Sequence, residues 1–351
     1  MKIAFYYSFP LQKDWNGADL EGDGLAGSET ALVHMARELA GSHQVHVFNR
    51  TSAGTLDHGV RFWNQDDLPT GVRWDVFVVV RGPAPDPASV RADIKVYWSI
   101  EEDRSQIRDW GQALRFFDAV FTVSAFHTER LAWRCGVPRH RIYETRLGIN
   151  PVDYAETLPK VPYRLIYCSV PGKGLAHLAG IYREVQKEIP AVSLVITGDY
   201  TLWGRGPDDE RHRALFRGLD GVEYLGRVPR KELVKLQKTS VLHVHPCVVE
   251  ELFCLPSLEC QAAATPSVCS DLGALPTTVE DGRSGSIVRA RFDSSGFHAA
   301  FASEVSGLLR SPDVLSRMAD YARERALTRF SYDIIASEWL KEFETLRNAA
   351  G

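Results

Sequence analysis

Short apolar runs alternate with amphipathic segments along the whole chain, and these runs form two successive series. Apolar runs without polar alternation indicate strands that are buried on both faces of a parallel sheet. The helical patterns between the runs predict right-handed crossover connections, and hence an α/β fold. The first series comprises Ile3–Tyr7, Val45–Phe48, Val76–Val80, Val96–Trp98 and Ala119–Val123, and the second comprises Leu165–Cys168, Ser193–Thr197, Val222–Leu225, Val241–Val244 and Ser267–Ser270.

A linker candidate separates the two series. The segment Pro151–Pro162 contains three prolines, which punctuate the chain and favour a connection between two domains of ordinary size. We therefore expect one α/β domain over residues 1–155 and a second over residues 156–329. The tail Ser311–Asn348 has a helical pattern.

The first helix is expected over Glu29–Ala40, with Ser28 as its N-cap. The polar stretch Gln12–Asp23 before it is loop-like, and one hypothesis is that it folds over a ligand. Gly24 and Gly27 flank the helix start, where glycine backbone can approach a phosphate. The apolar residues of the expected helix share one face: Leu32, Met35, Ala36 and Leu39.

Composition narrows the class of protein. The chain has 351 residues and a formal net charge of −4, which argues against a general nucleic-acid binder. Its six cysteines show no paired short spacing, which favours reduced thiols in a cytoplasm. It opens on an apolar strand candidate rather than a secretory leader, and no apolar run approaches the length of a membrane span. We expect a cytoplasmic protein.

The most informative stretch is the segment Glu251-Leu-Phe-Cys-Leu-Pro-Ser-Leu-Glu259. It follows an apolar run, and Pro256 is suited to the first position of a helix. This pattern predicts a strand end, a loop that carries Glu251, and a helix that carries Glu259 in its first turn. The N–H groups of that turn would form an anion site, and ligands bind at such strand ends in open α/β sheets. An acid near a helix N-terminus is also favoured by the dipole alone, which explains Glu259 but not Glu251.

Lys173 is the candidate cation for the same site. It lies in a Pro-Gly-Lys-Gly turn directly after the apolar run Leu165–Cys168. A lysine at the carboxyl end of a strand can neutralise a diphosphate leaving group. The alternative is a solvated loop lysine, and the flanking pattern favours the functional interpretation.

The ordered motifs resemble glycosyltransferase family 4, a family of retaining enzymes with a Glu-x7-Glu signature. The resemblance covers nearly the whole chain in order. It implies the GT-B fold, with two Rossmann-like domains whose parallel sheets face an interdomain cleft, and a C-terminal helix at about 330–351 that completes the N-terminal domain. The motifs are Ala26–Thr30, Leu32–Leu39, Arg146–Asn150, Ser169–Leu175, Tyr224–Pro229, Glu251–Glu259, Ser270–Pro276 and Val279–Gly282.

The resemblance also implies an activity and residue roles. The enzyme would move a hexosyl group from a nucleotide-diphosphate donor to a hydroxyl acceptor with retention of configuration, and the leaving phosphate would take the acceptor's proton. Glu251 and Lys173 are the implied catalytic residues, Lys173 acting on the diphosphate. The implied donor-binding residues are Gly27, Ser28, Arg227, Val228, Phe253, Cys254, Leu255 and Glu259, with Glu101 and Glu102 on the acceptor side.

The expected partners follow from this reaction. They are a nucleotide-sugar donor, with UDP slightly favoured over GDP, and a small-molecule, glycan or lipid-linked acceptor, without a cofactor. The basic stretch Arg130–Arg146 is consistent with peripheral contact to the inner face of a membrane, although a solvated helix face is the favoured interpretation. The sequence leaves the oligomeric state open.

Two further features of the sequence leave open a metal site and a protein without catalytic activity. His243, His245 and Cys247 alternate along one strand, a spacing that can bind zinc, but satisfied side chains near the donor pocket are favoured because further ligands are not evident. The family resemblance implies no metal. Ile100, Val170 and Thr277 depart from the family pattern.

These departures support a rival, a nucleotide-sugar-binding protein without catalysis. Another GT-B enzyme, such as a sugar-nucleotide epimerase or a phosphorylase, is a second rival. A dinucleotide-dependent dehydrogenase is disfavoured, because the full three-glycine fingerprint is absent from the sequence.

Overall fold

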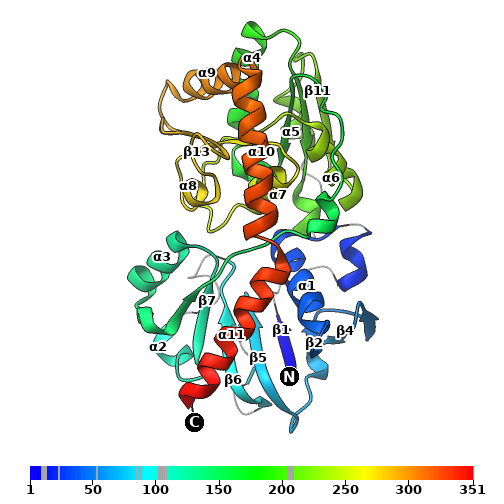
Figure 1. Ribbon diagram of the computed structural model, residues 1–351, viewed down its shortest axis with the longest axis vertical. Coiled ribbons are helices and arrows are strands. Elements are labelled where there is room, and N and C mark those ends of the chain that lie inside the picture. The colour runs from blue at the N-terminus through cyan, green and yellow to red at the C-terminus, as the bar shows by residue number, and fades with distance from the viewer. Residues whose placement is uncertain are drawn as a thin grey trace. The chain divides into compact units, whose positions relative to one another are not determined.

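The computed structural model describes residues 1–8, 14–22, 24–52, 54–83, 85–86, 89–101, 107, 109–203 and 209–350. It divides into two compact units, of which unit 1 comprises Met1–Gly148 and Tyr332–Gly351 and unit 2 comprises Ile149–Ser331. Each unit is built on a mainly parallel sheet with helices in the connections (Figure 1). The expected α/β class is confirmed.

Unit 1 contains a sheet in the order β3-β4-β2-β1-β5-β6-β7-β8 among the described residues. Its strand pairs are parallel except β3 with β4. The strands are β1 (Lys2–Tyr7), β2 (Gln44–Asn49), β3 (Thr55–Asp57), β4 (Val60–Asn64), β5 (Arg73–Val80), β6 (Arg91–Trp98), β7 (Ala119–Thr122) and β8 (Ile142–Glu144); the helices are α1 (Gly27–Ala40), α2 (Trp110–Ala113), α3 (Ala125–Cys135) and α11 (Tyr332–Ala350).

Unit 2 contains a parallel sheet in the order β11-β10-β9-β12-β13-β14. Its strands are β9 (Arg164–Cys168), β10 (Ser193–Thr197), β11 (Val222–Gly226), β12 (Leu242–His245), β13 (Ser267–Ser270) and β14 (Gly285–Val288). Its helices are α4 (Leu175–Glu188), α5 (Asp209–Ala214), α6 (Arg230–Thr239), α7 (Leu255–Ala262), α8 (Leu275–Thr278), α9 (Phe297–Leu309) and α10 (Pro312–Arg329).

The strands β3, β4, β8 and β14 lie outside the two predicted series. β4 reads Val-Arg-Phe-Trp-Asn and β3 is only three residues long. Both lie towards one edge of the unit 1 sheet, and β8 and β14 are edge strands. β8 is three residues long, and β14 reads Gly-Ser-Ile-Val although all four of its residues are buried. None of these four strands has a long apolar run, so periodicity alone does not reveal them.

The helix α11 returns to unit 1 after the whole of unit 2 has been traced. Figure 1 shows it (red) alongside α1 (blue), and the His34 and Tyr332 rings of the two helices stack with centroids 4.9 Å apart. Trp339 is fully buried, its ring 4.6 Å from that of Trp98, and its indole N–H donates to Thr145 Oγ1 at 2.8 Å. This aromatic contact fastens α11 to the sheet of unit 1.

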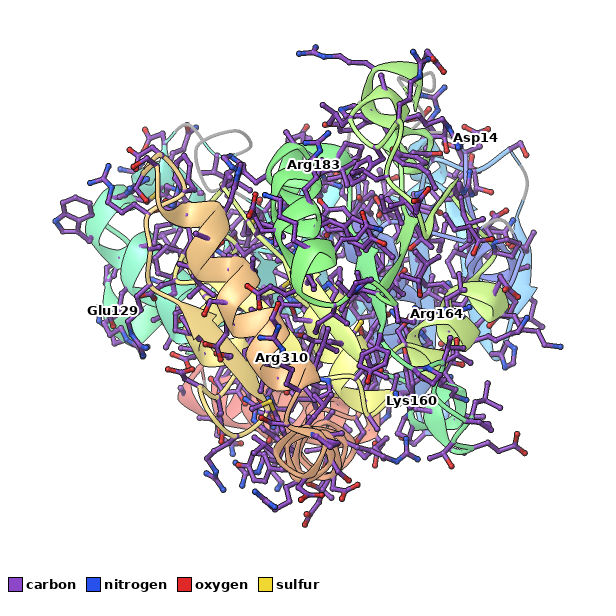
Figure 2. The ribbon with its side chains drawn as sticks, turned by 90° about the horizontal axis from the view of Figure 1, so that it is seen from above. Asp14, Glu129, Lys160, Arg164, Arg183 and Arg310 are labelled. Carbon is purple, nitrogen blue, oxygen red and sulfur yellow. The ribbon has the colours of Figure 1, made fainter. Side chains whose placement is uncertain are left out.

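The division between the units falls after Gly148, whereas the sequence analysis places a boundary after residue 155. The 3-10 helix η5 (Pro151–Tyr154) belongs to unit 2 because Tyr154 is fully buried there and its hydroxyl donates to Gln237 Oε1 at 2.9 Å. Lys160, which Figure 2 labels, also fastens this segment to unit 2. Its ammonium donates to Ala263 O at 2.9 Å and to Thr265 Oγ1 at 2.7 Å.

The stretch before α1 is packed in its described part. Trp15 is 4% exposed and makes edge contacts with the rings of Tyr7 and Phe62. The 3-10 helix η1 (Gly17–Leu20) begins with a capping box at Asn16. This part of Gln12–Asp23 is therefore structured, and its Trp15 and Leu20 side chains belong to the core of unit 1, while residues 12, 13 and 23 lie outside the described residues.

Candidate functional site

The side chains of Lys173 and Glu251 form an ion pair at the carboxyl ends of two neighbouring strands. Lys173 ends the 3-10 helix η6 (Pro171–Lys173) that follows β9, and Glu251 lies in the loop after β12. Because β9 and β12 are adjacent and parallel, these loops emerge at the same edge of the sheet. The Nζ–Oε2 distance is 2.7 Å. The structure therefore brings together the two residues whose catalytic role the family resemblance implies.

Two glycines make this approach possible. Gly174 has φ +108°, and a Cβ built on it would lie 1.9 Å from Pro246 O. Gly273 has φ +62°, and its Cβ would lie 2.5 Å from Glu251 O. Any side chain at either position would collide with backbone. The N–H of Ala274 then donates to Glu251 O at 2.7 Å, which anchors the loop that carries the carboxylate.

Both partners of the ion pair are held in their charged forms. Burial raises the pKa of Glu251, but Lys173 and His245 outweigh that effect and the net pKa is lowered. Burial likewise lowers the pKa of Lys173, and the neighbouring Glu251 carboxylate more than restores it. The site therefore presents an ammonium and a carboxylate side by side at neutral pH.

Glu259 is held by a separate buried network. Arg230 Nη1 lies 2.5 Å from Glu259 Oε1, and Gln237 Nε2 donates to Oε2 at 3.1 Å. Arg230 also pairs with Asp153 at 3.0 Å. The pKa of Arg230 is raised well above its usual range, because Glu259, Tyr154 and Asp153 outweigh the effect of burial. Glu259 is thus an oriented, ion-paired carboxylate.

The prediction for the start of α7 is wrong in detail. The helix begins at Leu255, with Cys254 as its N-cap, so Pro256 is the second helical residue rather than the first. No acidic residue lies in the first turn, and Glu259 comes one turn later. Cys254 is fully buried in a cluster with Cys247, Cys269 and Leu275, and this packing sets where the helix starts.

The other predicted donor residues of unit 2 lie around the same strand ends. The backbone N–H of Arg227 donates to Asp199 Oδ2 at 3.0 Å, and Val228 packs against an apolar cluster that includes Cys168 and Cys260. The Phe253 ring lies 6.3 Å from that of Phe330. Leu255 and Cys254 are buried at the start of α7.

In unit 1, two of the predicted residues, Ser28 and Glu101, meet at a cluster around Arg81. Ser28 Oγ donates to Glu101 Oε1 at 3.1 Å, and Arg81 Nη2 lies 3.2 Å from the same oxygen. The expected N-cap role of Ser28 is wrong, because α1 begins at Gly27 and Ala26 is its N-cap. The Ser28 hydroxyl is directed to Glu101 instead. Glu102 lies outside the described residues.

Arg81 is a site candidate that sequence reasoning missed. It follows β5 directly and has φ +59°, an uncommon conformation for a non-glycine residue. Its guanidinium contacts the Tyr7 hydroxyl at 3.1 Å and Glu29 at 3.5 Å, and Tyr7 donates to the Glu29 carboxylate. Burial, the largest effect, raises the pKa of Glu29. The position of Arg81 just after an apolar strand was the available signal.

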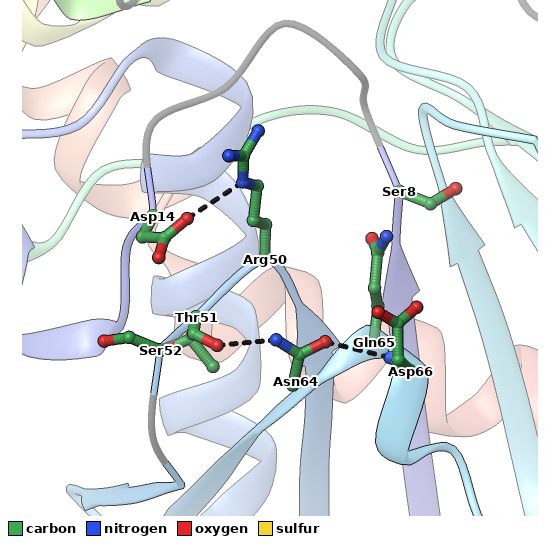
Figure 3. Close-up of a pocket in the computed structure, with 8 residues that line it drawn as sticks. All are labelled: Ser8, Asp14, Arg50, Thr51, Ser52, Asn64, Gln65 and Asp66. Atoms are coloured by element: carbon green, nitrogen blue, oxygen red, sulfur yellow. Dashed lines mark hydrogen bonds and ion pairs between the residues drawn. The ribbon is translucent and has the colours of Figure 1, made fainter.

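A polar pocket of about 410 Å³ lies at the carboxyl ends of β1, β2 and β4 (Figure 3). Arg50 donates to Asp14 at 2.9 Å, and Asn64 Nδ2 donates to Thr51 O at 2.8 Å. Hydroxyl, amide and carboxylate groups of this kind suit a polyhydroxylated ligand. The lining residues are Ser8, Asp14, Arg50, Thr51, Ser52, Asn64, Gln65 and Asp66.

The alternating residues of β12 and its following loop join two different clusters. His245 and Cys247 approach Glu251, with His245 Nε2 3.5 Å from Glu251 Oε1. His243 instead lies beside Cys168 and Cys260. The spacing of His243, His245 and Cys247 therefore does not correspond to one metal cluster among the described residues. The expectation of satisfied side chains holds only in part: His243 Nδ1 lies 3.0 Å from Ser267 Oγ, but the buried His243 Nε2 and both ring nitrogens of His245 make no hydrogen bond to the residues described.

Comparison with known proteins shows similarity of sequence within unit 2 and similarity of fold over nearly the whole chain. Residues 169–325 match the family model described as "Glycosyl transferases group 1". The chain has the GT-B fold. It resembles the sucrose-phosphate synthase of Thermosynechococcus elongatus with a TM-score of 0.73 and 16% identity, over 99% of this chain and 100% of that one. It also resembles Anabaena Alr3699/HepE in complex with UDP and glucose, with a TM-score of 0.70 and 14% identity, over 98% and 100%.

Curated relatives match over part of the chain. A phosphatidyl-myo-inositol mannosyltransferase of Mycobacterium leprae is 30% identical over 177 residues, which are 50% of this chain and 44% of that protein. An alpha-maltose-1-phosphate synthase of Mycobacterium tuberculosis H37Rv is 33% identical over 128 residues, 36% of this chain and 33% of that protein. The chain thus spans less than half the length of these relatives. Among its described residues, none of the helices has the length and apolar character of a membrane span.

Proposed function

We propose that the protein is a retaining glycosyltransferase that moves a sugar from a nucleotide-diphosphate donor to a hydroxyl acceptor. The observation that carries the proposal is the Lys173–Glu251 pair at the strand ends of unit 2, inside the segment that matches the glycosyltransferase family. A cation for a departing diphosphate and a carboxylate for sugar hydroxyls are the two groups that this reaction needs.

Different residues of unit 2 would contact different parts of the nucleotide-sugar donor. Lys173 would neutralise the charge that develops on the diphosphate as the glycosidic bond breaks. Glu251 would accept hydrogen bonds from the sugar hydroxyls, and the backbone from Phe253 to Leu255 would contact the sugar and phosphate. Glu259, oriented by Arg230, would accept from the ribose hydroxyls, with Arg227 and Val228 beside the base.

Unit 1 would supply further groups. The Gly27–Ser28 backbone would contact the diphosphate, and Glu101 and Glu102 would lie on the acceptor side. The polar pocket at the ends of β1, β2 and β4 is an additional candidate for acceptor hydroxyls. The acceptor would be a glycan, a small molecule or a lipid-linked sugar. The transfer would need no cofactor or metal, and it would take place in the cytoplasm or at the inner face of a membrane.

The donor base would be uracil in preference to guanine. Support comes from structural neighbours that were solved with UDP or UDP-glucose. A thermal-shift panel of UDP, GDP and their sugar conjugates at one shared concentration tests this preference, because the ligand with the lower Kd raises the melting temperature more. A larger shift with GDP than with UDP would contradict it.

The activity is tested by incubating the protein with the preferred donor and candidate acceptors and measuring released nucleoside diphosphate. The anomeric coupling of the product, read by NMR, tests retention. Glu251→Gln should keep the fold and lower turnover at least about hundredfold. Equal turnover in Glu251→Gln and wild type would refute the role of that residue.

The same experiment distinguishes the two alternative functions from a glycosyltransferase. Conversion of one donor sugar into another without an acceptor would identify an epimerase. A clear melting shift without any release of nucleoside diphosphate across the acceptor panel would identify a binding protein without catalysis.

A further inference from the structure

A buried cluster of two thiols and one imidazole lies within unit 2, apart from the Lys173–Glu251 pair. Cys168 ends β9, His243 is on β12 and Cys260 is on α7. One potential ligand atom from each residue lies within 4.8 Å of the others. His243 and Cys260 are fully buried, and Cys168 is 9% exposed. The proposed function uses none of these three side chains.

The separation of the thiols matches the geometry of a zinc site. Cys168 Sγ lies 3.7 Å from Cys260 Sγ. Two thiolates that bind one tetrahedral zinc ion at about 2.3 Å each lie about 3.8 Å apart. The sulfur atoms are thus spaced as two ligands of one ion would be.

The imidazole is oriented as a third ligand. His243 Nδ1 lies 3.0 Å from Ser267 Oγ, while the buried Nε2 makes no hydrogen bond to the described residues. Metal-binding histidines commonly use one ring nitrogen for the metal and the other for an outer hydrogen bond that fixes the ring. Ser267 would be that outer partner, and Nε2 would be the ligand atom.

The surroundings also favour a divalent ion. The thiols lie in an apolar cluster with Ile166, Val195 and Leu236, where an uncompensated charge would be costly. Two thiolates and one Zn²⁺ form a neutral unit. Binding follows Zn²⁺ + 2 RSH → Zn(SR)₂ + 2 H⁺, so that no oxidant or reductant takes part.

From this geometry we infer that Cys168, Cys260 and His243 bind one zinc ion, and that a water molecule takes the fourth position. The ion links β9, which precedes the 3-10 helix with Lys173, to β12 and to α7, which carries Glu259. This site stands independently of the proposed transfer reaction and is compatible with transfer chemistry that uses no metal.

The experiment uses the full chain with Co²⁺ as a spectroscopic substitute for zinc. Wild type should take up one equivalent and show thiolate-to-metal charge-transfer absorption with the intense visible bands of a tetrahedral ion. Zinc should displace the cobalt and remove these bands. Cys168→Ser and Cys260→Ser should each abolish them, whereas Cys247→Ser and Cys135→Ser, the matched thiol controls, should retain them.

Further variants keep the test decisive if a cysteine variant fails to fold, as judged by circular dichroism. Ser267→Ala keeps all three ligands and should weaken metal affinity by roughly 10–100-fold, as loss of an outer-shell partner does. Absence of tetrahedral bands in wild type would overturn the inference. Loss of the bands in Cys247→Ser but not in Cys168→Ser would do the same, as would a Cys168–Cys260 disulfide in the freshly purified protein by mass spectrometry.

Discussion

Lys173 and Glu251 lie 78 positions apart in the sequence, yet the lysine ammonium contacts the glutamate carboxylate at 2.7 Å. The contact results from the sheet order, which places β12 next to β9 and so brings their following loops together. Under the proposed function, the same ammonium would stabilise the leaving diphosphate. The pair therefore connects the topology of unit 2 to the proposed chemistry.

Replacement of Lys173 should slow transfer more than it weakens donor binding. Lys173→Met is expected to lower kcat roughly hundredfold, because the charge that it neutralises grows in the transition state. Steady-state kinetics with the preferred donor measures the effect. Lys231→Met, at an exposed position of α6 in the same unit, is the control and should match wild type. A Lys173→Met enzyme with unchanged kcat would remove the lysine from the mechanism.

Loss of Arg230 should destabilise the protein strongly. Arg230→Met leaves Glu259 and Asp153 without their ion-pair partner and should cost about 3 kcal/mol of unfolding free energy. Arg289→Met breaks an exposed ion pair with Asp281 and should leave the free energy of unfolding almost unchanged, because solvent screens such pairs. Chemical denaturation measures both.

A double-mutant cycle measures the coupling free energy between Arg230 and Glu259 separately from the loss of packing in each single variant. Arg230→Met with Glu259→Leu should cost less than the sum of the two single changes, because no buried carboxylate is left at position 259. Strict additivity would show that the two side chains are not coupled in solution.

Lys160 should make stability depend on alkaline pH. Burial lowers its pKa from 10.5 to about 8, so between these values the unfolded chain binds more protons than the folded one. Stability should therefore rise with pH across this window, with a contribution of up to about 1.4 kcal/mol per pH unit. Lys160→Met should remove this contribution, and Lys231→Met should not. Denaturation curves from pH 7.5 to 10.5 compare the slopes, and identical slopes in Lys160→Met and wild type would contradict the prediction.

Truncation of Trp339 should weaken the packing of α11 on unit 1 and lower the free energy of unfolding. Trp339→Ala removes a fully buried ring and its hydrogen bond to Thr145, at an expected cost of about 3–5 kcal/mol. Trp133→Ala, at a tryptophan that is 81% exposed, should change stability by no more than about 0.5 kcal/mol. Thermal and chemical unfolding of the two variants test the contrast. Equal stabilities would mean that the aromatic contact contributes little.

Local patterns were sufficient to predict the central strands and the alternation of strands and helices. The strands β10 and β13 have the predicted bounds, Ser193–Thr197 and Ser267–Ser270. These strands are buried on both faces, so hydrophobicity alone specifies them. Helix starts were predicted less well. α1 begins before Ser28 and α7 begins before Pro256, since tertiary packing overrides local capping preferences.

Sequence patterns could not predict which side chains contact the site residues. The position of Lys173 in a turn after a strand could be predicted, but its contact with Glu251 depends on which strands are neighbours. Arg230 and Arg81 were missed for the same reason. Each is charged and lies just after a strand or at the start of a helix, and only the folded chain shows that buried acids surround it.

The placement of α11 in unit 1 has a consequence for biosynthesis. The ribosome synthesises all of unit 2 before it reaches Trp339, whose ring packs against those of Trp98 and Phe121 in the folded protein. Unit 2 is contiguous in the sequence and can therefore fold first. Unit 1 is incomplete until α11 is synthesised, so the aromatic surface that α11 covers stays exposed. We expect this uncovered surface to make the nascent chain prone to aggregation until α11 has been synthesised.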